Sequence, residues 1–583
     1  MTERPLKPSS GVPLWGAFPT TALSLKTDLP IILTGLAFFY ALLSLARYSM
    51  GPVNVQPEIH LYPTALPKYA LYSVLRIAVA YFLSLCFTLI YAYVAAHNAK
   101  AERIMIPLLD TLQSIPVLSF LPGVMVAMVA LFPTRQLGVE LGAVLLILTG
   151  QAWNMTFSVY SSLKSIPVEM QEAAQIYRLS WWQKFRQLEL PYAAIGLIWN
   201  SMMSVAGGWF FLMACEMFVL GNRDLRLPGL GSYLQTAANI GDTRAIVWGV
   251  TVMVVVIILI DQLIWRPIIA WGEKFKFEQV EAAQTARSPV LDVLRQSKLL
   301  GVVSRLSVTP AREALDMCFA GDRGPSLRGR FWRMVNPWLW RGLSTFALAG
   351  IVYAIGRISI LLASLSWAEF GGILWGAAAT FIRVELALLL AALWTIPVGV
   401  FIGLRARLSA IAQPIAQIAA SVPATALFPI ILLGLIRMGG GLGTGSIVLL
   451  LLGTQWYILF NVIAGATAIP TDLKEVCDLF HLGRIERWRR LLFPGIFPYL
   501  ITGLVTASGG AWNASIVAEY FHFKGQTIST AGLGAIISHA TDSGNFRVLL
   551  AATIVMAAIV VTINRLVWRR LYVLASTKYK LES

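Results

Sequence analysis

The sequence predicts an all-α integral membrane protein with about twelve transmembrane helices, arranged as two homologous six-helix halves. Its composition, its apolar runs and an internal repeat support this prediction. Of the 583 residues, 57% are hydrophobic and 13% are charged, and the mean hydropathy is +0.70. Soluble domains carry about 25% charged residues. The apolar runs are long enough to cross the hydrocarbon region, which takes about 20 residues, so a soluble multidomain chain is excluded.

The chain divides into two apolar halves and three polar segments. Residues 1–28 are polar and offer no short apolar stretch before a small-residue cleavage site, so we expect a cytoplasmic N-terminal segment and no signal peptide. The first half is expected at 29–270, with spans at 29–48, 69–96, 105–132, 139–160, 194–220 and 243–270. A charged stretch containing Pro and Gly predicts a cytoplasmic linker at 271–341. The second half is expected at 342–575, with spans at 342–364, 373–404, 410–436, 446–466, 498–520 and 547–574, before a cytoplasmic tail at 576–583.

The net charge of +17 points to membrane topology rather than to nucleic acid. Lys and Arg gather in the short segments beside apolar runs and in the linker, the distribution that the positive-inside rule describes. We therefore expect a multi-pass protein of the cell inner membrane with both termini in the cytoplasm. The four cysteines form no CxxC pair and the five histidines show no HxxxH spacing, so neither a disulfide framework nor a metal site is expected.

A parallel repeat relates the two halves. Gly150 recurs as Gly453, a displacement of 303 residues, and the same displacement holds to the end of the sixth span. It relates Trp153, Pro167, Glu172, Pro191, Trp209, Glu216, Gly229-Leu230-Gly231, Arg244 and Trp265 to Trp456, Pro470, Glu475, Pro494, Trp512, Glu519, Gly532-Leu533-Gly534, Arg547 and Trp568. Upstream, Ser114-Ile115-Pro116 matches Ser421-Val422-Pro423 with a slightly different displacement, so a loop between the third and fourth spans has changed length. Such a repeat indicates duplication.

A polar stretch follows the fourth span of each half. Residues 172–191 (EAAQIYRLSWWQKFRQLELP) and 475–494 (EVCDLFHLGRIERWRRLLFP) each carry several charges and end at a Pro just before the next span. Counting spans from a cytoplasmic N-terminus places both stretches in the cytoplasm. We expect two helical docking surfaces, in which Trp181, Trp182 and Trp488 serve as packing anchors or partner contacts.

These stretches resemble the EAA loop of the permease subunits of binding-protein-dependent ABC importers. The first copy keeps Glu172-Ala173-Ala174 and Leu190-Pro191, with Ser180 where the family has Gly. The second keeps Glu475, Gly483 and Phe493-Pro494, with Val476 and Cys477 in place of the alanines. The Trp-x6-Glu element followed by Gly-Leu-Gly resembles the nitrate/sulfonate/taurine branch. The resemblance implies a duplicated type I importer permease fold with EAA loops at 161–193 and 467–497.

The resemblance also implies partners. The EAA loops would couple to two ATP-binding cassette subunits, which would carry ATP and Mg, so this chain would be no enzyme and would need no cofactor. The glycine-rich stretch at 440–446 lacks the Lys of a phosphate-binding loop, in keeping with an ATPase on a separate subunit. A periplasmic or lipid-anchored binding protein would deliver a small anion such as a sulfonate, nitrate or bicarbonate. The coupling residues would be Glu172, Ala173, Ala174, Ser180, Pro191, Glu475, Gly483 and Pro494.

Several intramembrane residues are candidates for the translocation path. Glu216 and Glu519 lie in the fifth spans, where a carboxylate is costly and marks a pathway or a partner. Alternatively, they pair with Arg244 and Arg547. Pro116 and Pro423, with Pro122 and Pro429, are expected to kink the third spans, whose freed backbone groups could face the path or serve packing alone. Trp209 and Trp512 complete the candidates, and Arg383 with Glu385 is expected to form a local pair.

Two other function classes compete with the importer. An ion-coupled secondary transporter would use Glu216 and Glu519 as proton sites, and its chain could also be duplicated. Such a carrier has no need of a cytoplasmic coupling helix, so the EAA loops favour the importer. A channel is a more distant alternative.

Overall fold

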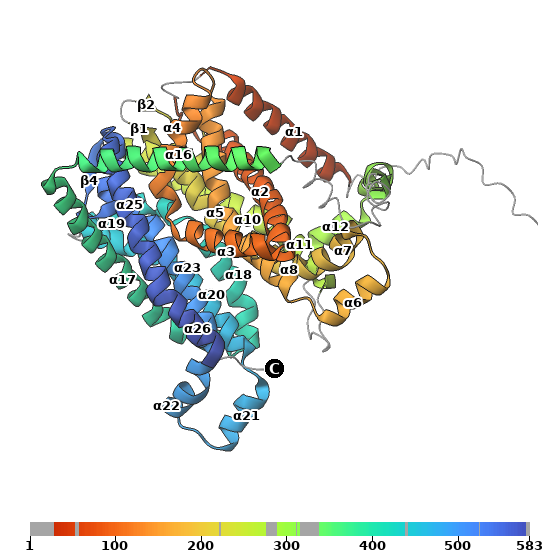
Figure 1. Cartoon of the computed structure of the whole chain (residues 1–583). Coiled ribbons are helices and arrows are strands. Elements are labelled where there is room, and N and C mark those ends of the chain that lie inside the picture. The colour runs from red at the N-terminus through yellow and green to blue at the C-terminus, as the bar shows by residue number, and fades with distance from the viewer. Residues whose placement is uncertain are drawn as a thin grey trace, which may run out of the picture.

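The structure is a computed structural model that describes residues 28–52, 58–220, 223–275, 288–310, 312–314, 337–437, 441–523 and 525–578. The predicted N-terminal segment, much of the linker, the end of the tail and the beginning of the glycine-rich stretch at 440–446 lie outside the described residues. Within them the chain is almost wholly helical, with two short antiparallel hairpins (Figure 1).

The first half and the linker contain most of the smaller elements. The elements are α1 (Asp28–Met50), η1 (Pro63–Ala65), α2 (Leu66–His97), α3 (Ala99–Ser114), α4 (Val117–Leu131), α5 (Leu137–Lys164), α6 (Val168–Ile176), α7 (Trp181–Lys184), η2 (Phe185–Glu189), α8 (Leu190–Glu216), β1 (Val219–Leu220), β2 (Arg223–Asp224), α9 (Leu230–Ile240), α10 (Thr243–Ile260), η3 (Asp261–Trp265), α11 (Arg266–Gly272), η4 (Glu273–Phe275), α12 (Pro289–Gln296), α13 (Lys298–Val303) and η5 (Ser304–Val308).

The second half repeats this order. Its elements are α16 (Pro337–Ala363), α17 (Trp367–Gly403), α18 (Ala406–Ser421), α19 (Ala424–Arg437), α20 (Leu442–Ala468), α21 (Thr471–Leu479), α22 (Arg484–Arg487), η6 (Trp488–Leu492), α23 (Phe493–Ala518), β3 (Tyr520–Phe523), β4 (Gln526–Ser529), α24 (Leu533–Asp542), α25 (Phe546–Ile563), η7 (Asn564–Trp568) and α26 (Arg569–Lys578). In the two hairpins Val219 pairs with Asp224, and Tyr520 pairs with Ser529.

The duplicated membrane fold is confirmed, although fewer spans are counted than predicted. Among the described residues, nine helices are long and apolar enough to cross a membrane, and two bent helix pairs raise the number to eleven. The remaining predicted span, at 342–364, forms the continuous helix α16, which lies across the bundle in Figure 1 rather than along the other helices.

The third span of each half is broken at its first proline. Helices α3 and α4 meet at 98°, and the corresponding part of α18 and α19 meets at 79°. The residue before a proline disfavours helical dihedrals, and Ile115 and Val422 are both extended, with ψ of 127° and 114°. The predicted bend is therefore confirmed at Pro116 and Pro423. Pro122 and Pro429 lie inside α4 and α19 instead.

The second part of each broken span packs against its own half and also reaches the other half. Helices α2, α5 and α8 pack together in the first half, as do α17, α20 and α23 in the second. Helix α4 then contacts α23, α24 and α25, while α19 contacts α8, α9 and α10. Hydrogen bonds cross the boundary from Asn564 to Ser114 (2.7 Å) and from Thr553 to the Ser119 carbonyl (3.1 Å). The boundary between the halves is thus built by the third spans.

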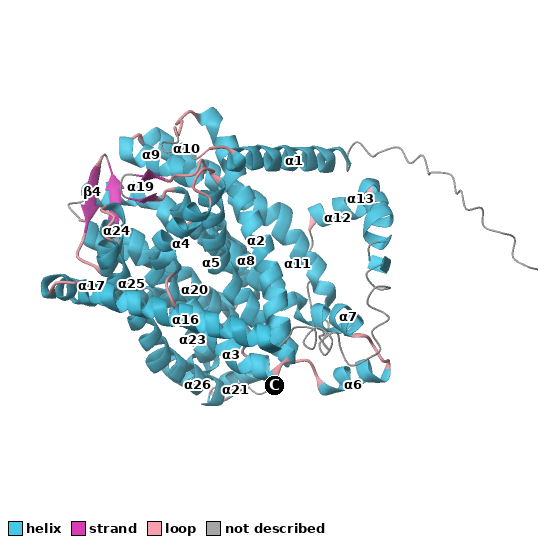
Figure 2. Cartoon of the chain, turned by 45° about the horizontal axis from the view of Figure 1, so that its top comes forward, coloured by secondary structure: helices cyan, strands magenta, loops and turns pink. Residues whose placement is uncertain are grey.

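The EAA loops and the hairpins lie at different ends of the bundle. In Figure 1 helices α6, α21 and α22 extend at the lower side while the strands lie at the upper left, and Figure 2 separates them in the same way. We call these the EAA-loop end (α6, α7, α21 and α22) and the hairpin end (β1 to β4).

Candidate translocation and coupling sites

A buried arginine of α2 joins three elements of the first half. The Arg76 side chain is 0% exposed. Its Nε and Nη2 donate to the two oxygens of Glu140 in α5, each at 2.7 Å. Its Nη1 donates to Glu216 at the end of α8 and to the Pro228 carbonyl, both at 2.8 Å. One guanidinium therefore binds two buried carboxylates, a fork geometry that arginine provides and lysine does not.

The Glu216 carboxylate also holds the first turn of α9. It accepts hydrogen bonds from the Ser73 hydroxyl (2.7 Å) and from the Gly231 N–H (2.8 Å). Ser73 in turn accepts the Leu230 N–H at 3.0 Å. The first N–H groups of a helix have no partner within it and favour an anion. Glu216 therefore supplies the negative charge at the N-terminus of α9.

The second half repeats this cluster. Arg383 of α17 binds the Glu519 carboxylate and donates to the Ala531 carbonyl at 2.9 Å. Glu519 accepts the Thr380 hydroxyl and the Gly534 N–H, both at 2.8 Å. Thr380 accepts the Leu533 N–H at 2.8 Å. Ser73, Arg76 and Glu216 thus have Thr380, Arg383 and Glu519 as their structural counterparts, and we call each set a latch.

The latches differ in one carboxylate. The position of Glu140 corresponds to Gly443 in the repeat, so Arg383 has no second acidic partner among the described residues. Its side chain is 12% exposed, whereas Arg76 is fully buried. The first latch therefore carries two carboxylates on one guanidinium, and the second carries one.

The Gly-Leu-Gly turns make room for these carboxylates. A Cβ on Gly229 would overlap the Glu216 carboxylate, and a Cβ on Gly532 would overlap that of Glu519. Both glycines have extended backbones, with φ of −178° and 177°. The requirement for glycine at these positions is therefore steric.

The latches correct two expectations from the sequence. Glu216 binds Arg76 and not Arg244, whose side chain is exposed. Arg383 binds Glu519 and not Glu385, and its counterpart in the first half is Arg76. A signal was available in the sequence. The displacement of 307 residues between Pro116 and Pro423 also relates Ser73 to Thr380 and Arg76 to Arg383.

A cavity of about 180 Å³, which we call the central cavity, lies between the halves. Residues of α3, α4, α5 and α8 line it from the first half, and residues of α20, α23, α25 and η7 line it from the second. Two equivalent pairs line it, one member from each half: Asn154 with Tyr457, and Gly207 with Gly510. A Cβ on Gly207 would lie 3.6 Å from the Tyr457 hydroxyl, and one on Gly510 would lie 3.5 Å from its ring. The Tyr457 side chain therefore lies close to both glycines and narrows the cavity.

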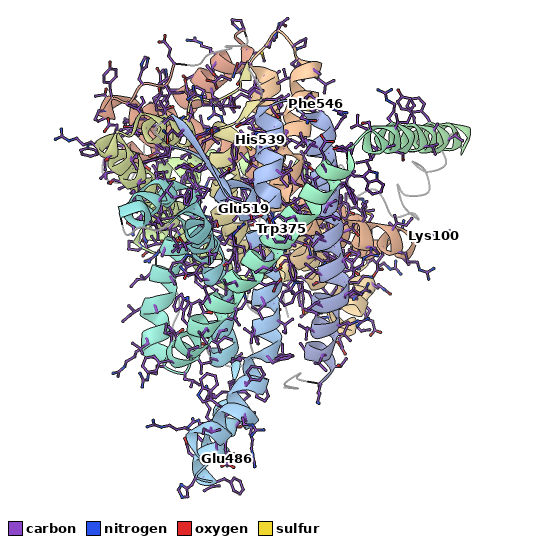
Figure 3. All side chains as sticks on the ribbon, turned by 90° about the vertical axis from the view of Figure 1, so that its left-hand side faces the viewer. Lys100, Trp375, Glu486, Glu519, His539 and Phe546 are labelled. Atoms are coloured by element: carbon purple, nitrogen blue, oxygen red, sulfur yellow. The ribbon has the colours of Figure 1, made fainter. Side chains whose placement is uncertain are left out.

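The predicted path residues fall into two groups. Trp512 lines the central cavity, and Pro116 lies between two residues that line it, Ser114 and Val117. Trp209 is 1% exposed within the core and is not among the lining residues of this cavity. Glu216 and Glu519 are fully buried in the latches. Figure 3 shows Glu519 deep within the bundle, between His539 at the hairpin end and Glu486 at the EAA-loop end.

A wider cavity of about 550 Å³ opens at the hairpin end. Its charged side chains are paired: Arg226 binds Asp224 at 2.9 Å, and Asp542 binds His522 at 3.1 Å. Burial raises the pKa of Tyr520, and its hydrogen bond to Asp542 raises it further. The cavity is bounded by α4 and α9 of one half and by β3 and α24 of the other, so it lies between the halves as the central cavity does.

Each EAA loop has the same two-helix shape. Helices α6 and α21 end at Ile176 and Leu479, and two residues later Arg178 and His481 both have φ of 49°. The next helix begins after Ser180 or Gly483, whose φ values of −63° and −60° suit any residue. The residue with a positive φ, where glycine would be favoured, thus lies two residues before the position at which the family motif has glycine. Ser180 replaces the family glycine without strain, and its side chain caps α7 by accepting the Gln183 N–H.

The exposed surface of α6 and α21, the first helix of each loop, is acidic and apolar. Glu172 and Glu475 are exposed, Ala173 is half-buried, and Ala174 and its counterpart Cys477 are buried, which explains why small residues occupy that position. Ile176 and Tyr177 are each 79% exposed, and their counterparts Leu479 and Phe480 are 76% and 71% exposed. Burial lowers the pKa of Lys474, and Arg487 lowers it further. The duplicated apolar tip is a feature that sequence analysis did not single out.

One continuous helix joins each EAA loop to a latch. The helical segment from Trp181 to Glu216 spans 36 residues, and that from Arg484 to Ala518 spans 35. Pro191 and Pro494 lie in the first turn of α8 and α23, next to the π-helical turns η2 and η6. At 1.5 Å per residue such a helix is roughly 50 Å long, so it connects the EAA-loop end with the buried carboxylate.

The chain belongs to the family described as the binding-protein-dependent transport system inner membrane component. That family matches residues 84–264 and again 395–574, together more than half of the chain. The fusion of two permease domains in one polypeptide is thereby confirmed, and so is a multi-pass membrane protein.

Individual relatives come from the branch that the sequence indicated. The chain is 29% identical over 196 residues to the nitrate import permease protein NrtB of Leptolyngbya laminosa, covering 34% of this chain and 67% of the relative. It is 26% identical over 204 residues to the bicarbonate transport system permease protein CmpB of Synechococcus elongatus (35% and 70%). It is 28% identical over 183 residues to the taurine transport system permease protein TauC of Escherichia coli (31% and 62%).

Proposed function

We propose that this chain forms the complete transmembrane pathway of an ATP-driven importer for a small anion. Both permease domains that such a pathway needs are present in one polypeptide. The EAA loops would bind two ATP-binding cassette subunits, which hold ATP and Mg. A binding protein, periplasmic or lipid-anchored, would deliver the solute at the hairpin end, and membrane lipids would surround the bundle.

The observation that carries this proposal is the continuous helix between each EAA loop and its latch. An exposed acidic and apolar tip lies at one end, and a carboxylate bound to arginine lies at the other. When an ATPase dimer closes, it can tilt both helices as rigid rods, a domain motion of the hinge and shear type. Because α8 and α23 also line the central cavity, such a tilt would open one end of the path and close the other.

Orientation follows from the same proposal. The EAA loops and both termini would face the cytoplasm, and the protein would lie in the cell inner membrane. The solute would enter the 550 Å³ cavity, pass the central cavity beside Trp512 and the break at Pro116 and Pro423, and leave toward the EAA loops. Nitrate, bicarbonate and sulfonates such as taurine are the candidate solutes, since the relatives are named for them.

The rival is an ion-coupled carrier in which Glu216 and Glu519 exchange protons. Both carboxylates are fully buried, and each is bound by an arginine and by a backbone N–H. Protonating either carboxylate would break its ion pair and leave the buried guanidinium without that partner, which is costly. We therefore propose that these residues hold the helix ends and do not carry protons.

The importer is tested by charge reversal at the coupling helices. E172K/E475K is expected to abolish solute uptake and the stimulation of ATPase activity, because it places two cations where the docking surface is acidic. The matched control D292K/E313K makes the same charge change on exposed residues of the linker and should retain uptake. Uptake and ATPase activity are measured on the complex purified from its native membrane, with folding checked by size-exclusion chromatography. Normal uptake by E172K/E475K would overturn the coupling role.

A further inference from the structure

The second latch leaves part of its guanidinium without a partner. Arg76 makes four hydrogen bonds, two of them to the Glu140 carboxylate through Nε and Nη2. Arg383 makes three, and the bond from its Nη2 to the Thr530 hydroxyl is 3.4 Å long. Nε of Arg383 has no partner among the described residues. The edge that binds a carboxylate in the first latch is therefore incompletely used in the second.

This edge of Arg383 is open to solvent. The side chain is 12% exposed, and its hydrogen bond to the Ala531 carbonyl lies at an exposed position. Some donors of the described chain, such as the indole N–H of Trp512, are buried without any partner. Nε of Arg383 is not one of these buried donors, so a ligand from solution can reach it.

Space for a ligand lies beside the guanidinium. Gly443 of α20 occupies the position that Glu140 occupies in α5. Outside its own stretch of chain, a Cβ on Gly443 would meet one atom within 4 Å, Oγ1 of Thr530 at 3.8 Å. The same Oγ1 accepts from Nη2 of Arg383. The volume that the Glu140 side chain fills in the first half is thus open in the second, next to the cation.

The helix that precedes each core explains why one latch is covered and the other is open. Helix α1 contacts α2 and α5. Its Tyr48 stacks on Tyr72, whose ring lies beside the Arg76 guanidinium. Helix α16, which comes at the same place in the second half, packs mainly against α25 and lies across the bundle in Figure 1. The second latch has no such cover from α16.

We propose that Arg383, Gly443 and Thr530 form a binding site for an oxyanion with at least two oxygens on one central atom. The ligand takes the place of the carboxylate that Glu140 supplies to Arg76. A guanidinium fork matches two such oxygens, and formate, bicarbonate and nitrate have this shape. The first latch carries one net negative charge and the second carries none, so a bound monoanion gives both latches the same charge.

The site is independent of the proposed importer function. Arg383, Gly443 and Thr530 do not line the central cavity, and the ligand would bind to the chain without an ATPase. Its expected effect is on the stability of the second half, because it would bind the cation of the second latch and so stabilise the folded state, the only state that assembles the site.

The repeat indicates a variant that should replace the ligand. G443E places a carboxylate on α20 where Glu140 stands on α5. We expect G443E to melt at a higher temperature than the wild type in chloride and to lose its response to added oxyanions, with an apparent affinity at least about tenfold weaker. G443Q is the matched control, because it has the same length and removes the same glycine but carries no charge. G443E should therefore also melt above G443Q.

The converse variant opens the equivalent place in the first latch. E140A removes the second carboxylate from Arg76 and should lower the melting temperature in chloride. Formate should then restore part of the loss, so that E140A responds to formate more strongly than the wild type. Should E140A fail to fold, the comparison of G443E with G443Q and the wild type still decides the matter.

The measurement is thermal unfolding of the purified full chain in detergent. Sodium formate, bicarbonate or nitrate replaces sodium chloride at constant ionic strength, and the melting temperature is followed by circular dichroism. The same chemistry is found in the phosphate of a lipid headgroup. A second series therefore adds short-chain phosphatidylglycerol, with the diacylglycerol of equal chain length as its control. A response to formate assigns a free solute, and a response to phosphatidylglycerol alone assigns a headgroup.

The outcomes separate this site from the importer. Stabilisation of the wild type by an oxyanion of either series, lost in G443E, would support the site. Equal stabilisation of the wild type and G443E, or no stabilisation of the wild type in either series, would overturn it. Absence of ATP-driven uptake by the wild-type complex would overturn the importer instead, since the melting experiment contains no ATPase.

Discussion

The two latches perform the same task with different charge. In the first half Arg76 holds Glu140 and Glu216 and is sealed from solvent, and in the second Arg383 holds Glu519 alone and stays 12% exposed. A buried charge is tolerated only when it is paired. The second half lacks the second carboxylate at Gly443 and keeps its arginine closer to solvent. Duplication preserved the hydrogen bonds to the helix N-terminus and allowed the surrounding charges to diverge.

This difference teaches which part of the latch is general. The arginine, the hydroxyl of Ser73 or Thr380, the carboxylate and the Gly-Leu-Gly turn occur in both halves. Together these groups fix the end of the fifth span (α8 or α23) to the helix that follows the hairpin (α9 or α24). Glu140 is an addition of one half that ties α5 to α2.

The largest expected effect comes from removing each arginine. R76M leaves two buried carboxylates without a cation and should lower the free energy of unfolding by about 3–5 kcal/mol or more, the range for breaking a buried ion pair. R383M leaves one carboxylate and should cost less. The measurement is the denaturation of each purified variant in detergent.

R244M serves as the control for this comparison. Arg244 is exposed and makes no contact with Glu216, so its loss should leave the stability unchanged. An equal or larger loss in R383M than in R76M would contradict the asymmetry between the latches.

A smaller effect is expected from the turn glycines. G229A and G532A each place a methyl group against a latch carboxylate, and overpacking of this kind costs about 1–3 kcal/mol. Because the turns are equivalent, the two losses should match, unlike those of the arginines. Thermal unfolding of both variants checks this, with G434A as the control, since a Cβ there would meet nothing within 4 Å. A marked difference between G229A and G532A would show that the turns are not equivalent.

The smallest effect concerns the caps of the second helices in the EAA loops. Ser180 caps α7, whereas Gly483 leaves α22 without a side-chain cap, although Glu486 stands three residues later. G483S should create a Ser-x-x-Glu capping box and stabilise α22 by about 0.3 kcal/mol, since glycine is itself a fair N-cap residue. Slower amide hydrogen exchange at 485–487 would show this, and S180G should speed the exchange of α7. Unchanged exchange in both variants would mean that the caps do not limit opening.

Features that depend on local pattern could be predicted from the sequence. Apolar runs longer than a bilayer crossing located most spans, and a constant displacement revealed the duplication and the EAA loops. The break at Pro116 and Pro423 followed from the restriction that proline places on the residue before it. The count of twelve spans was less secure, because α16 is long and apolar yet lies across the bundle.

Pairings between distant residues were decided by tertiary structure. Glu216 had several arginines within its half that could have neutralised it, and only the packing of α2 against α8 selects Arg76, 140 residues away. The cavity follows the same logic. Each lining tryptophan has a duplicate at the equivalent position of the other half, and the packing of the assembled bundle determines which copy lines the cavity. The sequence by itself determined the repeated parts, because helix formation and membrane insertion depend on local composition; the structure decided their partners, because burial and charge pairing depend on the assembled bundle.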